Sequence, residues 1–375
     1  MPIIPTVAGW IAGTPGTISL GQGVPFFGPP EEATRILGDV VREEGSHAYK
    51  PDAGLPKLRR AFEVKLRAEN GIDAPFERRI IVTAGANQAF LNAVLGIADP
   101  GDEIILLSPY YFNHEMAVAL AGCRAVCVPT DSLFQPRLGA IESAVTQRTR
   151  AVVTVSPNNP AGVVYPRRTL EAINRLCADR GICHISDEAY EYFTYGGVDH
   201  FSPASAGGDG HTISLFSMSK SYGMAGWRVG FLVAPEHLFD DLMKIQDTVI
   251  ICGPALSQAV ALEALRIGRE YCRKHLETIA SVREAVLLRL AAAKDLLEVP
   301  PSHGAFYLFA KVHTDRDPLS LTERLVREHK VAVIPGGTFG ITEGCYVRIA
   351  YGNLTREAAA EGVDRLITGL RALRG

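Results

Sequence analysis

Short hydrophobic runs alternate with longer amphipathic stretches between residues 61 and 235. Short apolar runs are typical of buried β-strands, whereas apolar positions that recur every three or four residues are typical of helices. Buried strands separated by helices predict an α/β fold with a mainly parallel sheet covered by helices on both faces. We expect strands over residues 79–83, 103–107, 125–128, 151–156, 182–187, 212–216 and 229–233, and helices over residues 87–97, 113–121 and 167–179.

A different pattern follows Gly253-Pro254. It predicts one long helix over residues 257–293, leading into a smaller α+β domain with strands 305–310, 331–334 and 345–350, helices 319–328 and 356–373, and a glycine-rich turn at 335–340. A chain of 375 residues is long enough for two domains. We therefore predict a large domain over residues 42–275, with residues 1–41 as a packed N-terminal arm and residues 276–375 as the small domain.

Polar and reactive residues follow directly after several of the predicted strands. In a parallel sheet the carboxyl ends of the strands lie at one edge, and ligands bind there. The sequence therefore predicts a binding site at that edge. The residues placed there are Gly85-Ala86-Asn87, Pro109-Tyr110-Tyr111, Asn158-Asn159-Pro160, Asp187-Glu188 and Ser217–Lys220.

Composition narrows the class of protein. Hydrophobic residues make up 47% and charged residues 21% of the chain, and the formal net charge is −3 without a long run of one sign. These values disfavour nucleic acid or a membrane surface as partner. The N-terminus lacks the basic and apolar regions of a signal peptide, and the seven cysteines lack metal-site spacing. We therefore expect a cytoplasmic protein with reduced thiols and no metal.

The segment around Lys220 carries the most specific signal. Ser217 and Ser219 precede the lysine, and Arg228 follows in an apolar stretch. A lysine amine forms covalent bonds when its pKa is lowered or a carbonyl traps it as an imine, while hydroxyls and a guanidinium can hold a phosphate. Residues 217–230 resemble the cofactor-lysine signature of class I/II aminotransferases, the fold type I enzymes that use pyridoxal phosphate.

The resemblance implies a reaction as well as a fold. Lys220 would hold pyridoxal phosphate as an imine and then move the proton between the substrate Cα and the cofactor C4′. The implied reaction transfers an amino group from an L-amino acid to a 2-oxo acid by a ping-pong mechanism. Fold and cofactor alone leave open a β-lyase (C–S lyase) or another reaction on the same scaffold.

Two further motifs resemble those of the same family. Residues 186–190 are similar to Asp-x-x-Tyr, which places Asp187 at the pyridine nitrogen and Tyr190 at the ring hydroxyl, although an acidic helix start would use the same residue types. Residues 156–162 resemble Asn-Pro-(Thr/Ser)-Gly, and the resemblance implies that Asn159 contacts the ring hydroxyl and the substrate side of the site. Alanine at position 161 departs from the usual hydroxyl residue.

A phosphate site is predicted where a strand meets a helix. Small residues at a helix N-terminus let backbone N–H groups reach a phosphate, although a close-packed turn would use the same residues. The residues assigned to the phosphate are Gly85, Ala86, Asn87, Ser217, Ser219 and Arg228. Tyr111 matches the position where the family stacks an aromatic on the cofactor ring, although an aromatic residue after a strand can equally be part of the core.

The resemblance also assigns a substrate site and a partner. Arg348 lies in an apolar strand, where an arginine is costly to bury without an anion, and it matches the family's clamp on the substrate α-carboxylate. A structural ion pair is the alternative. Gly23 would lie beside the bound amino acid, and Tyr49 would reach the cofactor phosphate of a second subunit, which implies a homodimer. We find no second arginine that marks a distal carboxylate.

Two interpretations from other classes are disfavoured. Residues 217–220 also fit Ser-x-x-Lys, the motif of penicillin-recognising acyl-transfer enzymes. Those enzymes need Ser-Asp-Asn and Lys-Thr-Gly companions, and the chain has only Ser186-Asp187-Glu188 and no Lys-Thr-Gly. An effector domain of a transcription regulator would need an additional basic helix-turn-helix region, which the chain lacks.

Overall fold

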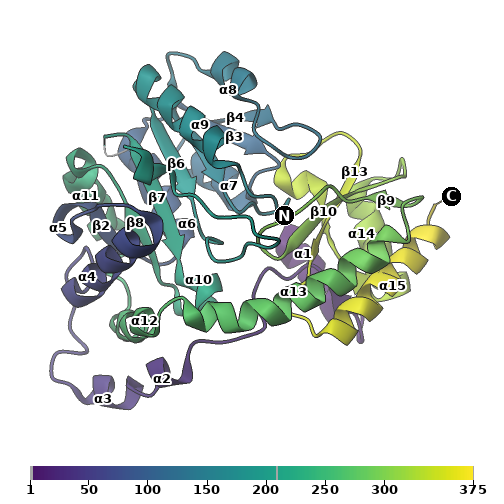
Figure 1. The fold of residues 1–375 in the computed structure, drawn as a ribbon, viewed down its shortest axis with the longest axis horizontal. Coiled ribbons are helices and arrows are strands. Elements are labelled where there is room, and N and C mark those ends of the chain that lie inside the picture. Colours follow the sequence, from purple (N-terminus) through teal and green to yellow (C-terminus); the bar gives the residue numbers. More distant parts are fainter. Residues whose placement is uncertain (1–2, 208–209, 375) are drawn as a thin grey trace.

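The computed structural model describes residues 3–207 and 210–374. The prediction that the N-terminus is not a signal peptide includes Met1-Pro2, and these two residues lie outside the described part of the chain. Figure 1 shows a larger and a smaller β-sheet, each packed against helices, with the long helix α13 (Glu270–Ala291) extending from the region of one toward the other.

The larger sheet has seven strands in the order β2-β8-β7-β6-β5-β3-β4. Strand β8 is antiparallel to both neighbours, and the other pairs are parallel. The predicted α/β fold with a mainly parallel sheet is therefore confirmed. The strands are β2 (Ile80–Thr83), β3 (Glu103–Ser108), β4 (Arg124–Pro129), β5 (Thr149–Val155), β6 (Cys183–Asp187), β7 (Thr212–Ser217) and β8 (Gly230–Val233).

Helices cover both faces of this sheet, which explains the uninterrupted apolar runs of its strands. Neighbouring residues of β3 show this arrangement, since Ile104 packs on one face of the sheet and Ile105 on the opposite face. The first face carries α6 (Ala86–Ile97), α7 (Phe112–Leu120) and α11 (Phe239–Val249), and the other carries α4 (Pro56–Lys65), α8 (Leu138–Ala144), α9 (Arg167–Arg180) and α12 (Ala255–Ile267). The predicted helices 87–97, 113–121 and 167–179 correspond to α6, α7 and α9.

The smaller sheet is antiparallel and packs on the C-terminal helices. Its order is β12-β13-β10-β9, with β9 (Leu297–Glu298), β10 (Tyr307–Val312), β12 (Ile334–Pro335) and β13 (Cys345–Ala350). Helices α14 (Pro318–His329) and α15 (Arg356–Ala372) complete this part. The N-terminal segment adds β1 (Ile18–Ser19) in parallel to β11 (Val331–Ala332). The domain boundaries given above stay a prediction.

Three of the predicted elements are wrong in detail. The helix expected over residues 257–293 is two helices, α12 and α13, because Gly268 has a φ of +81° that ends the first. The strand expected from residue 305 begins at Tyr307, because Ala305 is left-handed with a φ of 53°. The strand expected over residues 331–334 is divided between β11 and β12.

Several helices were not predicted. Besides α4, α8 and α11, they are α1 (Ile3–Ala12), α2 (Glu31–Thr34), α3 (Leu37–Arg42), α5 (Phe76–Arg79) and the four-residue α10 (Met218–Ser221). Most of these are short, and a short helix shows too few turns to reveal its period.

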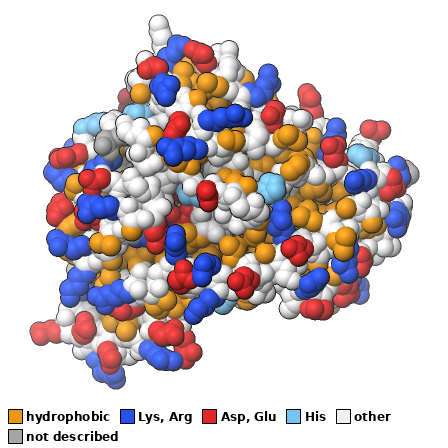
Figure 2. Space-filling model, in the orientation of Figure 1, with side chains coloured by type: hydrophobic (Ala, Val, Ile, Leu, Met, Phe, Trp, Pro, Cys, Tyr) orange, Lys and Arg blue, Asp and Glu red, His pale blue; other side chains and the backbone are white. Residues whose placement is uncertain are grey.

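The balance of acidic and basic residues in the composition is also seen on the surface. Figure 2 shows basic and acidic side chains interspersed over one face of the molecule. Within residues 3–207 and 210–374, no helix is both long enough and apolar enough to cross a membrane.

Candidate active site

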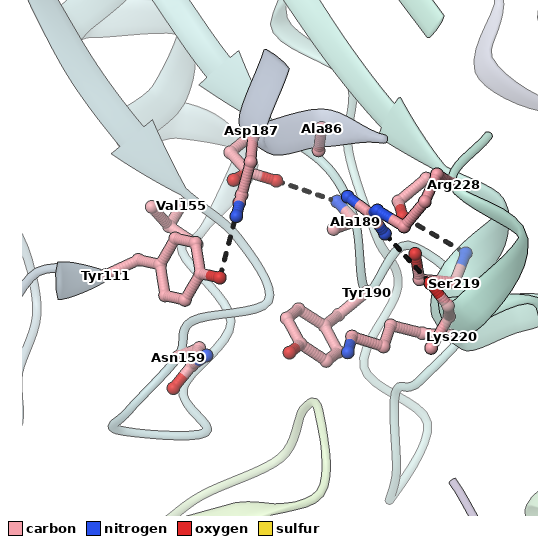
Figure 3. A pocket seen from close by; sticks show the side chains of 13 residues that line it. Ala86, Tyr111, Val155, Asn159, Asp187, Ala189, Tyr190, Ser219, Lys220 and Arg228 are labelled. Atoms are coloured by element: carbon pink, nitrogen blue, oxygen red, sulfur yellow. Dashed lines mark hydrogen bonds between the residues drawn. The ribbon is translucent and has the colours of Figure 1, made fainter. Parts of the chain in front are cut away.

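One cavity lies at the carboxyl ends of strands β5, β6 and β7, where the sequence predicted it. Figure 3 shows the side chains that point into it. Of the residues predicted for the cofactor, all except Gly85 and Tyr49 line the cavity, and Val155, Ala189 and Ala225 line it without having been predicted. The full lining is Ala86, Asn87, Tyr111, Val155, Asn159, Asp187, Ala189, Tyr190, Ser217, Ser219, Lys220, Ala225 and Arg228.

Asp187 ends β6 and is held on both carboxylate oxygens. Its Oδ1 accepts a hydrogen bond from the Ala189 backbone N–H at 3.0 Å, and its Oδ2 lies 3.1 Å from His114 Nε2. His114 stacks on Phe90 with a centroid distance of 3.9 Å, and both His114 and Asp187 are buried. The carboxylate therefore has a fixed direction in a dry environment, which suits an acid that must face one ring nitrogen.

No motif in the sequence predicted a role for His114. It lies in the first turn of α7, where a histidine looks like an ordinary core residue. No local signal links it to Asp187, because the two residues belong to different elements.

Residues next to Asp187 anchor its loop from behind. Glu188 accepts from Ser202 Oγ and lies 2.9 Å from His200 Nε2, while Glu191 pairs with the buried ammonium of Lys65. Asn70 bridges the two groups, since its Nδ2 donates to Glu191 and to Ser202. Some side chains of this loop thus face the cavity and others join a buried polar network. The network stiffens the part of the chain that carries Asp187 and Tyr190.

Lys220 projects into the cavity from the short helix α10. The Ser217 side chain caps this helix by accepting from the Ser219 backbone N–H at 3.1 Å. Lys220 Nζ donates to the carbonyl oxygen of Gly23 at 2.7 Å. Burial, together with the positive charges of Arg348 and Arg228, lowers the pKa of Lys220 to about 8, and the negative charge of Asp187 opposes this shift only in part. The neutral amine is therefore far more populated near pH 7 than in an exposed lysine.

The N-terminus of α6 and Arg228 form the end of the cavity predicted for a phosphate. Gly85 precedes α6 with a φ of +81°, and a Cβ there would lie 2.4 Å from Arg228 Nη2, so a larger residue would displace the guanidinium. Arg228 donates to the carbonyl oxygens of Ala84 and Ala225 at 2.8 and 2.9 Å. No side chain caps α6, which leaves its first N–H groups for an anion.

Tyr111 stands beside this end with its ring exposed to the cavity (Figure 3). Its hydroxyl donates to Asn87 Oδ1 at 3.3 Å and accepts from Asn113 Nδ2 at 2.9 Å. Both bonds fix the ring plane, so Tyr111 can serve as a stacking face for a flat ligand.

Arg348 is buried on β13 with only neutral acceptors. Its Nη1 donates to Asn159 Oδ1 at 2.9 Å, and its Nη2 donates to the carbonyl oxygen of Gly21 at 2.7 Å. Its Nε is buried and has no hydrogen-bond partner, and no carboxylate in the described part of the chain forms an ion pair with the guanidinium. A buried cation with an unused donor is a receptor for an anion.

Tyr49 does not reach the cavity of its own chain. Its side chain is 79% exposed, so a role at a phosphate would need a second subunit. Gly23 does lie at the cavity, since its carbonyl oxygen accepts from Lys220. Tyr307 is another contact that the sequence analysis missed: its ring carries the Arg348 guanidinium at 4.7 Å, and its hydroxyl lies 2.7 Å from that of Tyr190.

The fold and this cavity define the class of protein: a fold type I enzyme with a site for pyridoxal phosphate. The model of the aminotransferase class I and II family matches residues 15–366. The aromatic-amino-acid aminotransferase 2 of Thermococcus litoralis is 34% identical over 94% of this chain and 92% of its own, and the aspartate aminotransferase of Pyrococcus abyssi is 35% identical over 96% and 93%. A solved mutant of Thermus thermophilus aspartate aminotransferase superposes with a TM-score of 0.91 at 32% identity, covering 98% of this chain and 96% of that one.

The chain therefore belongs to the aminotransferase class I and II family. It is a transaminase that depends on pyridoxal phosphate. The alternative of a β-lyase on the same scaffold is not favoured, because the relatives are named as aminotransferases.

Proposed function

We propose that the enzyme moves an amino group from an L-amino acid to a 2-oxo acid by a ping-pong mechanism, with Lys220 as the residue that holds the cofactor and moves the proton. The observation that supports this most is the arrangement of Lys220 and Asp187, which line one cavity, and of the buried Arg348, whose charge acts on Lys220. Pyridoxal phosphate supplies an aldehyde for the amine and a ring that takes up the electrons of the broken Cα–H bond.

Each end of the cavity has its own task in this proposal. Asp187 would keep the pyridine nitrogen of the cofactor protonated, Tyr190 would donate to the ring hydroxyl oxygen, and Tyr111 would supply the stacking face. Asn159 links the ring hydroxyl to the substrate arginine. The phosphate lies against Gly85, Ala86, Asn87, Ser217, Ser219 and Arg228.

Arg348 would bind the substrate α-carboxylate in this proposal, and its unused Nε donor would help to set the direction of the Cα–H bond. The amine of Lys220 would hold the proton that leaves the substrate Cα and would deliver it to the cofactor carbon C4′. A pKa of about 8 suits both roles, because the amine must accept a proton and release it near neutral pH.

The test of this function is the absorption spectrum of the purified protein with its cofactor. We expect a visible band that bleaches with certain amino acids and returns when a 2-oxo acid is added. If pyruvate and ammonia accumulated from a cysteine-like donor while no acceptor was consumed, the reaction would be an elimination. A panel of donors in the same assay names the preferred amino acid.

We propose an uncharged, aromatic side chain for that preferred donor. The relatives include aminotransferases named for aromatic amino acids, aspartate and prephenate. Around Arg348 lie the rings of Tyr307 and Phe339, at 4.7 and 5.1 Å. Among the described lining residues the only cations are Lys220 and Arg228, so a single subunit offers no further charge for a distal carboxylate.

The amine of Lys220 in the cofactor-free protein should have a pKa well below that of an exposed lysine. We expect the rate at which the cofactor-free protein captures pyridoxal phosphate to rise with pH up to about 8 and to level off above it, because only the neutral amine attacks the aldehyde. Stopped-flow absorbance measures this rate. Arg348→Met removes one positive charge and should move the midpoint upward, whereas a wild-type midpoint near that of an exposed lysine would contradict the proposal.

Replacing Arg348 by lysine should weaken substrate binding selectively. A point charge cannot reproduce the planar fork, and an impaired buried charge pair costs about 2–5 kcal/mol, so kcat/KM should fall roughly 10²- to 10³-fold. Steady-state kinetics measure the effect, and cofactor affinity should be unchanged. Arg289→Lys, on α13 and ion-paired with Asp364, is the control. An equal loss in both variants would mean that Arg348 is structural.

We also propose a homodimer in which Tyr49 reaches the phosphate at the neighbouring site. Supporting it are the exposure of Tyr49 and of two apolar residues: Val41, which is near it in sequence and 44% exposed, and Leu256, which is 37% exposed and lines a hollow together with His47. Tyr49→Phe should raise the cofactor dissociation constant about 10- to 100-fold, the value of one hydrogen bond to a charged group. Light scattering together with cofactor titration tests both parts, and a monomer with wild-type affinity would contradict them.

The cytoplasm is the proposed compartment. The seven cysteines are all free, which is usual where glutathione keeps thiols reduced.

A further inference from the structure

A chain of three hydrogen bonds connects Lys220 to Tyr190 through groups to which the proposed function gives no role. Lys220 Nζ donates to the carbonyl oxygen of Gly23 at 2.7 Å. The Tyr307 hydroxyl lies 3.4 Å from the same oxygen and 2.7 Å from the Tyr190 hydroxyl. Both tyrosines are almost fully buried, so water does not substitute for these partners.

Proton counting determines the direction of these bonds. Each phenol carries one proton, and the Tyr307 hydroxyl has two acceptors within reach, the Gly23 carbonyl and the Tyr190 oxygen. The carbonyl oxygen has a second lone pair, but while Lys220 holds it at the shorter distance it is the poorer acceptor, and the Tyr307 proton goes to the nearer Tyr190 oxygen. The proton of Tyr190 is then free to point into the cavity.

The direction reverses when Lys220 leaves the Gly23 carbonyl. In the described residues Tyr307 is the other donor to this oxygen, so its proton turns there to satisfy it. Tyr190 then donates to the Tyr307 oxygen, at the same 2.7 Å, and withdraws its proton from the cavity.

We propose that Tyr307 is a positioning residue that couples the state of the Lys220 amine to the direction of the Tyr190 proton. This inference rests on the proposed function, in which Tyr190 faces the ring hydroxyl oxygen of the cofactor. With the cofactor held on Lys220, the carbonyl is released and Tyr190 donates weakly to the ring oxygen. With Lys220 free, Tyr190 donates fully. The protein thus adjusts the electron demand of the ring to the step at which Lys220 acts as base.

Other charged groups also face these hydroxyls and must stay constant in a test. Arg348 and Tyr111 lie near both phenols, and Asp187, Lys220 and Arg228 line the same cavity. Tyrosine-to-phenylalanine substitutions leave all of them in place. Burial raises the pKa of Tyr307 to about 12 and that of Tyr190 well above its usual value, so both phenols keep their protons throughout the working range of pH.

The experiment is a pH titration of the visible band of the cofactor-loaded enzyme. In Tyr307→Phe, Tyr190 has only the ring oxygen left to bond, and a donor there stabilises its anionic form. We expect the midpoint to fall by about 0.5–1 pH unit, the order of one neutral hydrogen bond. Tyr190→Phe should raise the midpoint, and the double variant should titrate like Tyr190→Phe alone.

The control is Tyr195→Phe, which loses a buried hydrogen bond of 2.7 Å to the Ala305 carbonyl oxygen outside the cavity and should leave the midpoint unchanged. An unmoved or raised midpoint in Tyr307→Phe overturns the coupling. A shift that persists in the Tyr190→Phe background also overturns it, since Tyr307 would then act by another route. A wild-type protein without a visible band overturns the proposed function itself, which is a separate result.

Discussion

Replacing Lys220 by alanine should lower kcat for transamination by at least about 10⁴-fold. The variant loses both the amine that holds the cofactor and the base that moves the Cα proton, and proton transfer alone contributes about 10²- to 10⁴-fold. Single-turnover kinetics with the best donor measure the loss. The cofactor should still bind, more weakly, because Arg228 and the N-terminus of α6 remain.

An exposed lysine is the control for this variant. Lys244→Ala, on α11 with a side chain that is 78% exposed, should leave kcat within a factor of two of wild type. Added methylamine should restore part of the Lys220→Ala activity, because it supplies an amine of the right size to the same cavity. Turnover within tenfold of wild type in Lys220→Ala would exclude this lysine from the chemistry.

Replacing Asp187 by asparagine should lower kcat/KM by about 10²- to 10³-fold. Asparagine has the same size but no charge, and the loss of one partner from a buried charge pair costs about 3–4 kcal/mol, with 1.36 kcal/mol for each factor of ten in rate. The cost falls on the step that needs a protonated pyridine nitrogen. Stopped-flow measurement of the first half-reaction isolates that step.

The neighbouring carboxylate separates this effect from a general disturbance of the loop. Glu188 follows Asp187 but turns to Ser202 and His200 behind the cavity. Glu188→Gln should therefore lower the melting temperature and leave the rate of the first half-reaction nearly unchanged. If the two variants slowed the reaction equally, the charge of Asp187 would have no special role.

Local pattern was enough to predict the sheet and the edge where the site lies. Each predicted strand of the large sheet overlaps an observed one, and for every strand except the partly exposed edge strand β4 the reason is that a strand buried on both faces must be apolar throughout. Two of the three wrongly predicted elements fall where the backbone takes an unusual conformation. Gly268 ends α12 and Ala305 delays β10, both at positive φ, and neither leaves a signal in the hydrophobic period.

The residues of the site also fall into those that a sequence motif predicted and those that it did not. Lys220 and Asp187 lie in motifs that can be read along the chain, but His114 and Tyr307 belong to none. Their contacts join distant parts of the sequence: Tyr307 and Gly23 are separated by 284 positions.

The sequence by itself determined the fold class, the family and the cofactor, because those depend on the residue types that chemistry and burial require at each position. The tertiary structure alone decided which groups share protons: His114 with Asp187, Arg348 with Asn159, and Tyr307 between Tyr190 and Gly23. Hydrogen bonds need atoms within about 3 Å, and only the folded chain brings such distant residues that close.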